Sequence, residues 1–424
     1  MSRPVSRPDV VVVGGGPAGA AAAITLAKAG ARVTVLDRAR FPRDKCCGDG
    51  LTASALRGLE DLGLDPATVG SWTPVGQVSL RGPSGRVVDL SLAPDGLHAA
   101  VARRADLDAA LVERARAAGA TVLEETPVTA LSGQDRGVHV AAGRAGTFSP
   151  GYVVAADGAW SASRKLLGQP TPGYLGDWHA MRRYVGGVGP DAGRLWVWFD
   201  PDLLPGYAWS FPLAGGRANV GFGIPRRPGV RSGTMGAVWE ALLQRPHVRA
   251  VLGPRAQPEG PVRAWPIPAT VDRSLLTGAG GRVLFAGDAA RVTDPMTGEG
   301  IGQALESGIA AARSIIVAGS GEPERAAARY EEEMGGGVLV DNRLAALLSR
   351  QLGSAIGARA AVRAAGLSRW TRANFTRWMF EDYPRAVVAT PGRWRRGVLK
   401  PPGAYRAERR PDGVRTAVGN LPAL

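Results

Sequence analysis

Both cysteines of this 424-residue chain, Cys46 and Cys47, are neighbours in the stretch FPRDKCCGDGL. Four uses are open for such a pair: a disulfide, half of a metal site, a nucleophile, or two small apolar residues in a loop. A bond between adjacent residues would strain the peptide that joins them, and disulfides are rare in the cytoplasm. Two thiols alone cannot form a tetrahedral metal site, and no histidine or further cysteine has suitable spacing. We therefore expect no metal, and we look to the surrounding elements for the role of the loop.

The clearest of these elements is a glycine-rich turn near the N-terminus. The apolar run 10–13 is typical of a strand buried on both faces, and the alanine-rich segment after the turn is typical of a helix. Between them lies a G-x-G-x-x-G pattern, which permits a tight turn, close approach of a diphosphate and packing of the helix on the strand. The N-terminus of the helix adds free N–H groups and a positive dipole end. The turn residues that we assign to dinucleotide binding are Gly14, Gly16, Pro17, Ala18 and Gly19.

An acidic residue supports the same site. Residues 32–36 predict a second strand, and Asp37 follows it, where its carboxylate can accept hydrogen bonds from an adenosine ribose. We assign Asp37 and the adjoining Arg38 to the dinucleotide. FAD and NAD both use this fingerprint, so it does not choose between them. The sequence has no second such turn in a strand–turn–helix setting, so we expect no dedicated NAD(P)H domain.

Three later stretches extend the predicted site. Asp157-Gly158 and Gly287-Asp288 each follow an apolar strand, and PMTGEG opens a helix of about five turns. The start of that helix would direct positive charge at the edge of a flavin ring on which negative charge accumulates during reduction. Glu299 is either a partner of the helix dipole or a catalytic acid. The residues of this stretch that we assign to the cofactor are Pro295, Gly298, Gly300 and Ile301.

The order of these motifs resembles that of FAD proteins of the glutathione-reductase and hydroxylase type. The loop FPRDKCCGDGLTASAL further resembles that of the geranylgeranyl reductase family, which includes bacterial menaquinone reductases. The resemblance covers about residues 9–315 and implies non-covalently bound FAD, with Asp288 at its ribityl or diphosphate part and Arg104 near it. Cys47 matches the family cysteine, whereas Cys46 occupies a variable position. Glycines such as Gly48 are expected to let the loop lie against the isoalloxazine ring.

A second stretch resembles the same family. LPGYAWSFPL matches its P-x-x-Y-x-W-x-F-P signature, which lines a tunnel for a polyprenyl chain in relatives. Strand alternation would place the three aromatic side chains on one face, as a continuous apolar wall. The residues that the resemblance assigns to the substrate are Pro205, Tyr207, Trp209, Phe211 and Pro212.

These elements predict an α/β fold with a Rossmann-type, hydroxylase-like FAD-binding domain, an antiparallel-sheet substrate domain and a helical C-terminal region. The FAD-binding domain is predicted to be discontinuous, over residues 1–65, 98–165 and 266–322. The substrate domain is predicted over 66–97 and 166–265, and the basic helical region over 323–424.

The resemblance implies reduction of carbon–carbon double bonds in a prenyl or isoprenoid substrate, with hydride from reduced flavin N5. An isolated trisubstituted alkene accepts hydride poorly, so an acid must be positioned in a dry pocket. The candidate acids are Cys47, Asp49 and Tyr207. The alternatives are an FAD-dependent monooxygenase acting on a natural product and a flavin-binding protein without catalysis. The expected electron donor is external: NADPH, a redox partner protein such as ferredoxin, or a deazaflavin.

The net charge of +15 is large. It indicates either the solubility of an arginine-rich chain or attraction to anionic lipid or phosphorylated substrates. Nucleic acid is not expected, because the chain has no zinc-finger spacing and no base-reading helix or aromatic RNA platform that we can place. No secretory signal or apolar stretch of spanning length is present, so we expect a cytoplasmic protein, either without membrane contact or peripheral at the inner face of an anionic membrane. Within the C-terminal region, segments that mix arginine with Leu, Trp and Phe fit either interfacial helices or a cap on the FAD domain.

Overall fold

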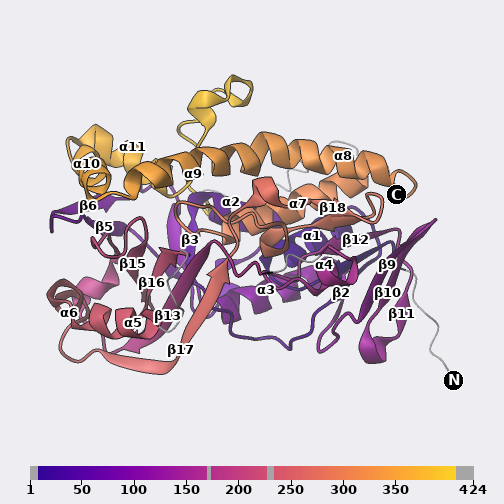
Figure 1. The fold of residues 1–424 in the computed structure, drawn as a ribbon, viewed down its shortest axis with the longest axis horizontal. Helices are drawn as coiled ribbons and strands as arrows, with labels where there is room; N and C mark the ends of the chain where they lie inside the picture. The colour runs from indigo at the N-terminus through magenta and orange to yellow at the C-terminus, as the bar shows by residue number, and fades with distance from the viewer. Residues whose placement is uncertain (1–7, 170–172, 227–233, 407–424) are drawn as a thin grey trace.

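The computed structural model describes residues 8–169, 173–226 and 234–406. Figure 1 shows two sheet-containing regions side by side, with a row of C-terminal helices running along both. A largely parallel sheet and its helices form one region, and a largely antiparallel sheet forms the other. The predicted fold class is confirmed.

The dinucleotide-binding region is built on a six-stranded sheet in the order β18-β19-β12-β1-β2-β8. Its strands are β1 (Val10–Val13), β2 (Val33–Leu36), β8 (Thr121–Leu123), β12 (Tyr152–Ala155), β18 (Thr277–Gly278) and β19 (Val283–Phe285). Every neighbouring pair is parallel except β18–β19. The four valines of β1 are all buried, as expected for a central parallel strand. The carboxyl ends of β1, β2, β12 and β19 share one edge, where ligands bind in open parallel sheets.

Helices that pack closely on one another support this sheet. Helix α1 contacts α3 and α7, and α7 also contacts α2 and α8. A Cβ atom at Gly308 would lie 2.1 Å from the Ala18 carbonyl oxygen, so α7 can cross α1 this closely only with glycine there. The helices are α1 (Pro17–Lys28), α2 (Ala53–Leu62), α3 (Arg104–Ala117), α4 (Ala162–Leu166), α7 (Ile301–Ala318) and α8 (Pro323–Met334).

Two small sheets and several short turns complete this region. One sheet has the order β3-β7-β4 and the other β11-β10-β9. Their strands are β3 (Gly50–Thr52), β4 (Thr73–Pro74), β7 (Ala99–Val101), β9 (Ala130–Gln134), β10 (Gly137–Ala141) and β11 (Thr147–Phe148). Single 3₁₀ turns lie in this region at Pro66–Thr68, Gly143–Ala145, Val271–Arg273 and Gly287–Ala290. Another, Pro190–Gly193, lies between β13 and β14, and two lie after α11, at Val387–Ala389 and Pro391–Arg393.

The second region is a seven-stranded sheet in the order β17-β13-β16-β15-β14-β5-β6. Its strands are β5 (Gln77–Arg81), β6 (Val87–Ser91), β13 (Trp178–Gly186), β14 (Leu195–Trp198), β15 (Tyr207–Leu213), β16 (Arg217–Pro225) and β17 (Gln257–Ile267). The sheet is not antiparallel throughout, because β5 pairs with β14 in parallel. The β5–β6 hairpin comes from an earlier part of the chain, so no tight turn constrains its direction relative to β14. Helices α5 (Thr234–Gln244) and α6 (Pro246–Leu252) share an apolar core with this sheet.

The C-terminal helices connect the two regions. Helix α8 is joined through a segment that is kinked at Gly337, Gly335–Leu339, to α9 (Val340–Leu352), and the two run from the parallel sheet to the antiparallel one (Figure 1). Helices α10 (Ala355–Ala365) and α11 (Arg369–Met379) follow, and α11 packs on β6. No helix in the described part of the chain combines the length and apolar composition needed to cross a membrane.

Candidate active site

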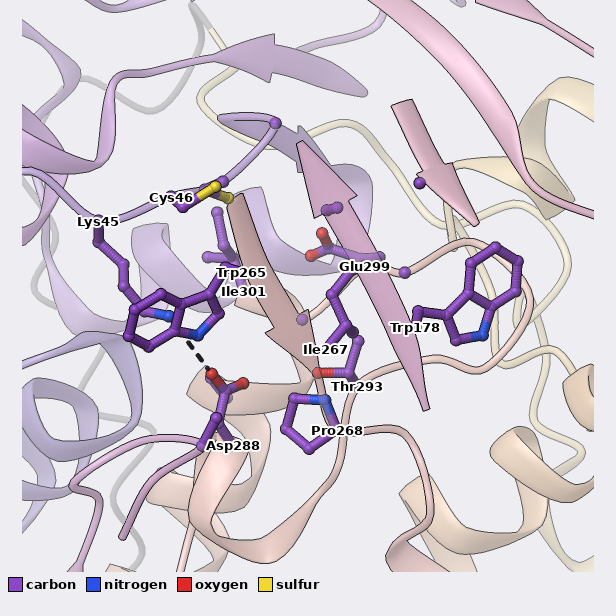
Figure 2. Close-up of a pocket in the computed structure, with 18 of the residues that line it drawn as sticks. Lys45, Cys46, Trp178, Trp265, Ile267, Pro268, Asp288, Thr293, Glu299 and Ile301 are labelled. Carbon is purple, nitrogen blue, oxygen red and sulfur yellow. Dashed lines mark ion pairs between the residues drawn. The ribbon is translucent and has the colours of Figure 1, made fainter. Parts of the chain in front are cut away.

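A cavity of about 1000 Å³ lies among the carboxyl edge of the parallel sheet, the antiparallel sheet and the C-terminal helices. Figure 2 shows Lys45 and Cys46 on a loop at one side, and Glu299 and Ile301 at the start of α7. This volume lies at the upper end for a small-molecule site, so the cavity can hold a large ligand or two smaller ones.

The glycine turn forms part of the wall of this cavity. Gly14, Gly16, Pro17 and Ala18 line it, and Gly16 precedes α1 without a side-chain cap, which leaves the first N–H groups of the helix for a ligand. Gly14 has a φ of +100°, and a Cβ there would lie 2.4 Å from the Ala156 carbonyl oxygen. Both observations explain why the turn requires glycine.

Asp37 ties the end of β2 to this turn. Its carboxylate accepts hydrogen bonds from the backbone N–H groups of Gly15 and Ala39, both at 2.7 Å. Asp37 and Arg38 line the cavity. Because each carboxylate oxygen has a second lone pair, Asp37 retains capacity to accept a hydrogen bond from a ribose hydroxyl.

Arg104 begins α3 beside the same turn. Its guanidinium makes a bidentate pair with the buried Asp108, with both bonds at 2.8 Å, and Arg43 reaches the same carboxylate at 2.9 Å. A Cβ at Gly16 would meet only the ends of Arg43 and Arg104, at 3.6 and 3.8 Å. Two guanidinium groups therefore border the space in front of the α1 N-terminus.

Two acidic residues follow the other sheet strands, and both line the cavity. The Asp157 carboxylate accepts from Ser161 Oγ at 2.6 Å and from the Ser163 N–H at 2.8 Å, so it organises the turn into α4. Asp288 lies 3.8 Å from the Lys45 ammonium, which also stands over the Trp265 ring at 3.9 Å (Figure 2). Lys45 thus joins the cysteine loop to the Gly287–Ala290 turn.

The start of α7 forms another part of the wall. Gly300 precedes the helix without a side-chain cap, and Gly298 has a φ of +70°. The Glu299 carboxylate accepts from the Gly302 N–H at 2.8 Å, as expected for a partner of the helix dipole. Burial, together with the neighbouring Glu381, raises the pKa of Glu299 to about 8. Glu299 is therefore mostly neutral at pH 7, and both of its proposed roles stay open.

The glycines of the cysteine loop contact aromatic side chains. A Cβ at Gly50 would lie 2.9 Å from Phe211 Cε2, and one at Gly48 would lie 3.3 Å from the same atom. The sequence led us to expect that these glycines would make room for the isoalloxazine ring. In the structure they also make room for Phe211, which comes from the antiparallel sheet, and the contact with the ring stays a prediction.

Asp49 is the most enclosed acid of the loop. It is fully buried in a left-handed backbone conformation (φ 65°) and lines the cavity. Its carboxylate accepts from Tyr184 Oη at 2.9 Å, Asn219 Nδ2 at 2.8 Å and the Arg104 N–H at 3.2 Å. Burial raises its pKa to about 6, and these hydrogen bonds oppose the rise.

The two cysteines are free thiols at the cavity wall. Burial raises the pKa of Cys47 to about 11 and that of Cys46 to about 12, so both keep their protons at neutral pH. Cys46 Sγ donates to the Arg263 carbonyl at 3.4 Å.

The aromatic residues of β15 form one wall. Tyr207, Trp209 and Phe211 line the cavity, and consecutive ring centroids are 5.9 Å apart. Tyr207 Oη donates to the Thr297 carbonyl, and burial raises the pKa of Tyr207 well above its ordinary value. Pro205 also lines the cavity. Three residues that the sequence assigned to the cofactor or the substrate do not line the cavity: Gly19, Pro212 and Pro295. The missing Cβ of Gly19 instead makes room for the Gly14 carbonyl.

The C-terminal helices supply a second apolar wall, which sequence reasoning missed. They contribute side chains from all three of α9, α10 and α11: Leu348, Leu352, Ala358, Val362, Phe375, Trp378 and Met379. The helical spacing of Leu348 and Leu352, and of Phe375 and Met379, was a usable signal, because it marks one apolar face on each helix.

Asn219, Tyr184 and Lys45 were also missed. Asn219 is a fully buried polar residue in β16, a strand that is apolar after Asn219, and such a residue needs hydrogen-bond partners. That isolated polarity was the available signal. Its partners on the distant cysteine loop could not be read from spacing.

These residues fit FAD. The uncapped start of α1 and the nearby Arg43 and Arg104 suit a diphosphate, and Asp37 suits a ribose. Asp288 and the uncapped start of α7 line the same cavity and suit the ribityl chain and the flavin.

Comparison with known proteins agrees with this geometry. The family described as FAD binding domain matches residues 7–334. A menaquinone reductase of Mycolicibacterium smegmatis is 33% identical over 370 residues, covering 81% of this chain and 85% of that protein. Digeranylgeranylglycerophospholipid reductase 1 of Methanopyrus kandleri is 33% identical over 320 residues, covering 71% and 78%.

A solved structure shows the same fold. The crystal structure of a geranylgeranyl bacteriochlorophyll reductase-like protein from Thermoplasma acidophilum superimposes with a TM-score of 0.75. The match covers 92% of this chain and 99% of that one, at 22% sequence identity.

Proposed function

Because this chain belongs to the geranylgeranyl reductase family of FAD-dependent oxidoreductases, we propose that it saturates carbon–carbon double bonds of a prenyl chain bound in the cavity. One observation carries the proposal. The glycine turn, the cysteine loop and two apolar walls all line the same space. A chain held between those walls would present an alkene to the residues beside the cofactor site.

The two apolar walls account for the substrate class. Tyr207, Trp209 and Phe211 form one wall, and side chains of α9–α11 form the other. These side chains bind an isoprenoid chain by burial of apolar area and exclude water from it. The names of the relatives, a menaquinone reductase and a digeranylgeranylglycerophospholipid reductase, support a quinone or a glycerolipid as the molecule that bears the chain.

Reduced FAD, when bound, supplies the hydride, so the protein must supply a proton. We assign that proton to Cys47 Sγ, because Cys47 lines the cavity with its thiol protonated at neutral pH, whereas Cys46 Sγ donates to the Arg263 carbonyl. Asp49 is mostly ionised at pH 7, and its carboxylate already accepts three hydrogen bonds, so it positions the loop. Tyr207 directs its proton at the Thr297 carbonyl. The Cys47 thiolate would regain a proton from solvent, because its pKa lies far above neutral pH.

The electron donor is external in this proposal. In the part of the chain that the structure describes, β1–α1 is the one strand–turn–helix unit with the G-x-G-x-x-G pattern. The donor would therefore reduce FAD without binding to a second dinucleotide-binding domain of this chain. It would be NADPH, a ferredoxin-type redox partner or a deazaflavin. We place the protein in the cytoplasm at the inner face of a membrane, where prenylated lipids reside.

Mass spectrometry tests the reaction. The FAD-loaded protein is reduced with dithionite under anaerobic conditions and incubated with menaquinone or a geranylgeranylated glycerolipid. After the quinone ring is reoxidised in air, we expect a gain of two hydrogen atoms per saturated bond in at least one of them, and none with oxidised protein or with dithionite alone. No mass change, or an oxygen-dependent gain of one oxygen atom, would contradict the proposal, and the latter result would indicate a monooxygenase.

A further inference from the structure

After Asp341 in the first turn of α9, the helices α9–α11 carry charge of one sign. Between Asp341 and Glu381 the sequence has seven arginines and no acidic residue. Arg377 pairs with Asp382, but none of the other six forms an ion pair with another described residue. Five of these six are exposed: Arg343, Arg350, Arg359, Arg363 and Arg369. This part of the surface is therefore strongly positive.

The same helices expose large apolar side chains. Ile356 is 79% exposed, Trp370 73%, Leu367 68% and Leu347 54%. They come from α9, α10, α11 and the α10–α11 turn, and α10 packs against both of the other helices. Apolar side chains this exposed, placed among cations, mark an interaction surface.

The inner side of these helices lines the substrate cavity. Leu352, Val362 and Phe375 face the cavity, whereas Ile356 and Trp370 are exposed to solvent. The helices therefore have apolar side chains on two sides. Those on the inner side line the cavity. The other side is left for a partner.

We propose that the outer surface of α9–α11, formed by Leu347, Arg350, Ile356, Arg359, Leu367 and Trp370, docks on an anionic lipid bilayer. The proposal rests on the proposed function, because a prenyl substrate partitions into lipid. Arginines gain energy near anionic headgroups, and no acidic residue of this segment opposes them. Leucine, isoleucine and tryptophan insert at the boundary between headgroups and acyl chains.

Charge also argues against a second copy of this chain as the partner. In a two-fold symmetric dimer the same patch faces itself, so the arginines of the two copies would repel one another. A bilayer rich in anionic lipid offers both opposite charge and an apolar interior. Docking there would bring the apolar wall of the cavity next to the membrane that holds the substrate.

Vesicle flotation tests the surface separately from the reaction. The FAD-loaded protein is mixed with phosphatidylcholine vesicles that contain or lack phosphatidylglycerol, at low and high salt. One variant combines Ile356→Ser with Trp370→Ser, and another combines Arg350→Gln with Arg359→Gln. The matched controls lie outside these helices: Leu275→Ser, and Arg136→Gln combined with Arg144→Gln, all at exposed positions.

We expect wild type to float with anionic vesicles at low salt and the control variants to do the same. Each arginine removed from the outer surface should weaken partitioning about fivefold, and the apolar pair should weaken it at least about tenfold. Wild type that does not float, outer-surface variants that float as well as wild type, or a dimer in solution that only these variants dissociate would each overturn the proposal.

Turnover of a detergent-dispersed prenyl substrate is measured on the same variants. It distinguishes membrane docking from the proposed reductase function. Lost flotation with retained turnover supports docking by this surface. If flotation depends on the surface but no prenyl compound is reduced, docking is supported and the proposed function is overturned.

Discussion

Asn219 Nδ2 donates a hydrogen bond to Asp49 Oδ2 at 2.8 Å, and both side chains are fully buried. The same nitrogen donates to the Cys47 carbonyl at 2.9 Å, and the amide oxygen accepts from the Trp209 indole at 3.1 Å. One side chain thus fixes the cysteine loop to the aromatic wall. Burial raises the pKa of Asp49 to about 6, and the Asn219 hydrogen bond limits that rise.

Asn219→Ala should shift the pH dependence of turnover. In wild type, activity should fall as the pH drops through about 6, because protonation of Asp49 weakens its hold on the surrounding donors. Without Asn219 the pKa of Asp49 rises, so this acid limb should move to higher pH, and turnover at neutral pH should fall about tenfold or more. The measurement is kcat/KM against pH. Asn374→Ala serves as control, since that amide donates to the Trp370 carbonyl of its own helix. An unshifted acid limb would refute the role of Asn219.

Cys47→Ala should slow alkene reduction by about a hundredfold or more while FAD stays bound, because it removes the proposed proton donor. The chain contains its own control in the adjacent Cys46, whose thiol donates to the Arg263 carbonyl. Cys46→Ala should keep most of the activity. Single-turnover rates and bound flavin are measured on both variants. Equal rates in the two variants would remove Cys47 from the chemistry.

Sequence patterns predicted the parts of the protein that depend on local chemistry. Three such parts are the strand of four valines, the glycine turn and the acid after β2. Each can be explained by the properties of residues that are close together in the sequence. The apolar face of β15 follows from alternation, so Tyr207, Trp209 and Phe211 could be placed on one wall.

The features that the sequence did not predict depend on contacts between residues far apart in the chain. Gly48 and Gly50 contact Phe211, more than 150 residues later in the sequence, and no local pattern announces that contact. The parallel pairing of β5 with β14 is equally non-local. The wall formed by α9–α11 could be predicted as apolar helical faces, but the cavity that those faces line depends on how the helices cross the antiparallel sheet.

Asp37→Ala should weaken FAD binding about tenfold to a hundredfold, the range for hydrogen bonds to a charged group. The change leaves the Gly15 and Ala39 N–H groups without their carboxylate partner and removes the acceptor proposed for the ribose. Flavin retained after gel filtration and the dissociation constant of added FAD measure the effect. Asp65→Ala, which removes an exposed cap from the Pro66–Thr68 turn, should leave both unchanged. Full flavin occupancy in Asp37→Ala would contradict the assignment.

Glu299→Gln should make stability less dependent on pH. The folded-state pKa of Glu299, about 8, lies above its ordinary value of about 4.3. Its contribution to stability is therefore fully present below about pH 4 and is lost as the pH rises through about 8. Glutamine stays neutral at both pH values. The Tm of the variant minus that of wild type should therefore be larger at pH 9 than at pH 6. Thermal melts at both pH values measure this. The control is Glu332→Gln at an exposed position, and its Tm should change with pH as that of wild type does. If the Tm of Glu299→Gln also changes with pH as that of wild type does, Glu299 is not held neutral.

Ala358→Phe should shorten the prenyl chain that the protein accepts. Ala358 lies on the cavity side of α10 and is buried, so a phenyl ring there would fill part of the apolar space between the helices and β15. We expect KM for a long-chain substrate to rise at least about tenfold, because the displaced isoprene unit loses its burial. A substrate with a shorter chain, which does not reach α10, should be affected less, and bound FAD should not change. The matched control is Ala360→Phe, two residues along the same helix and exposed to solvent. If both variants reduce long and short chains at the same relative rates as wild type, the chain does not lie against α10.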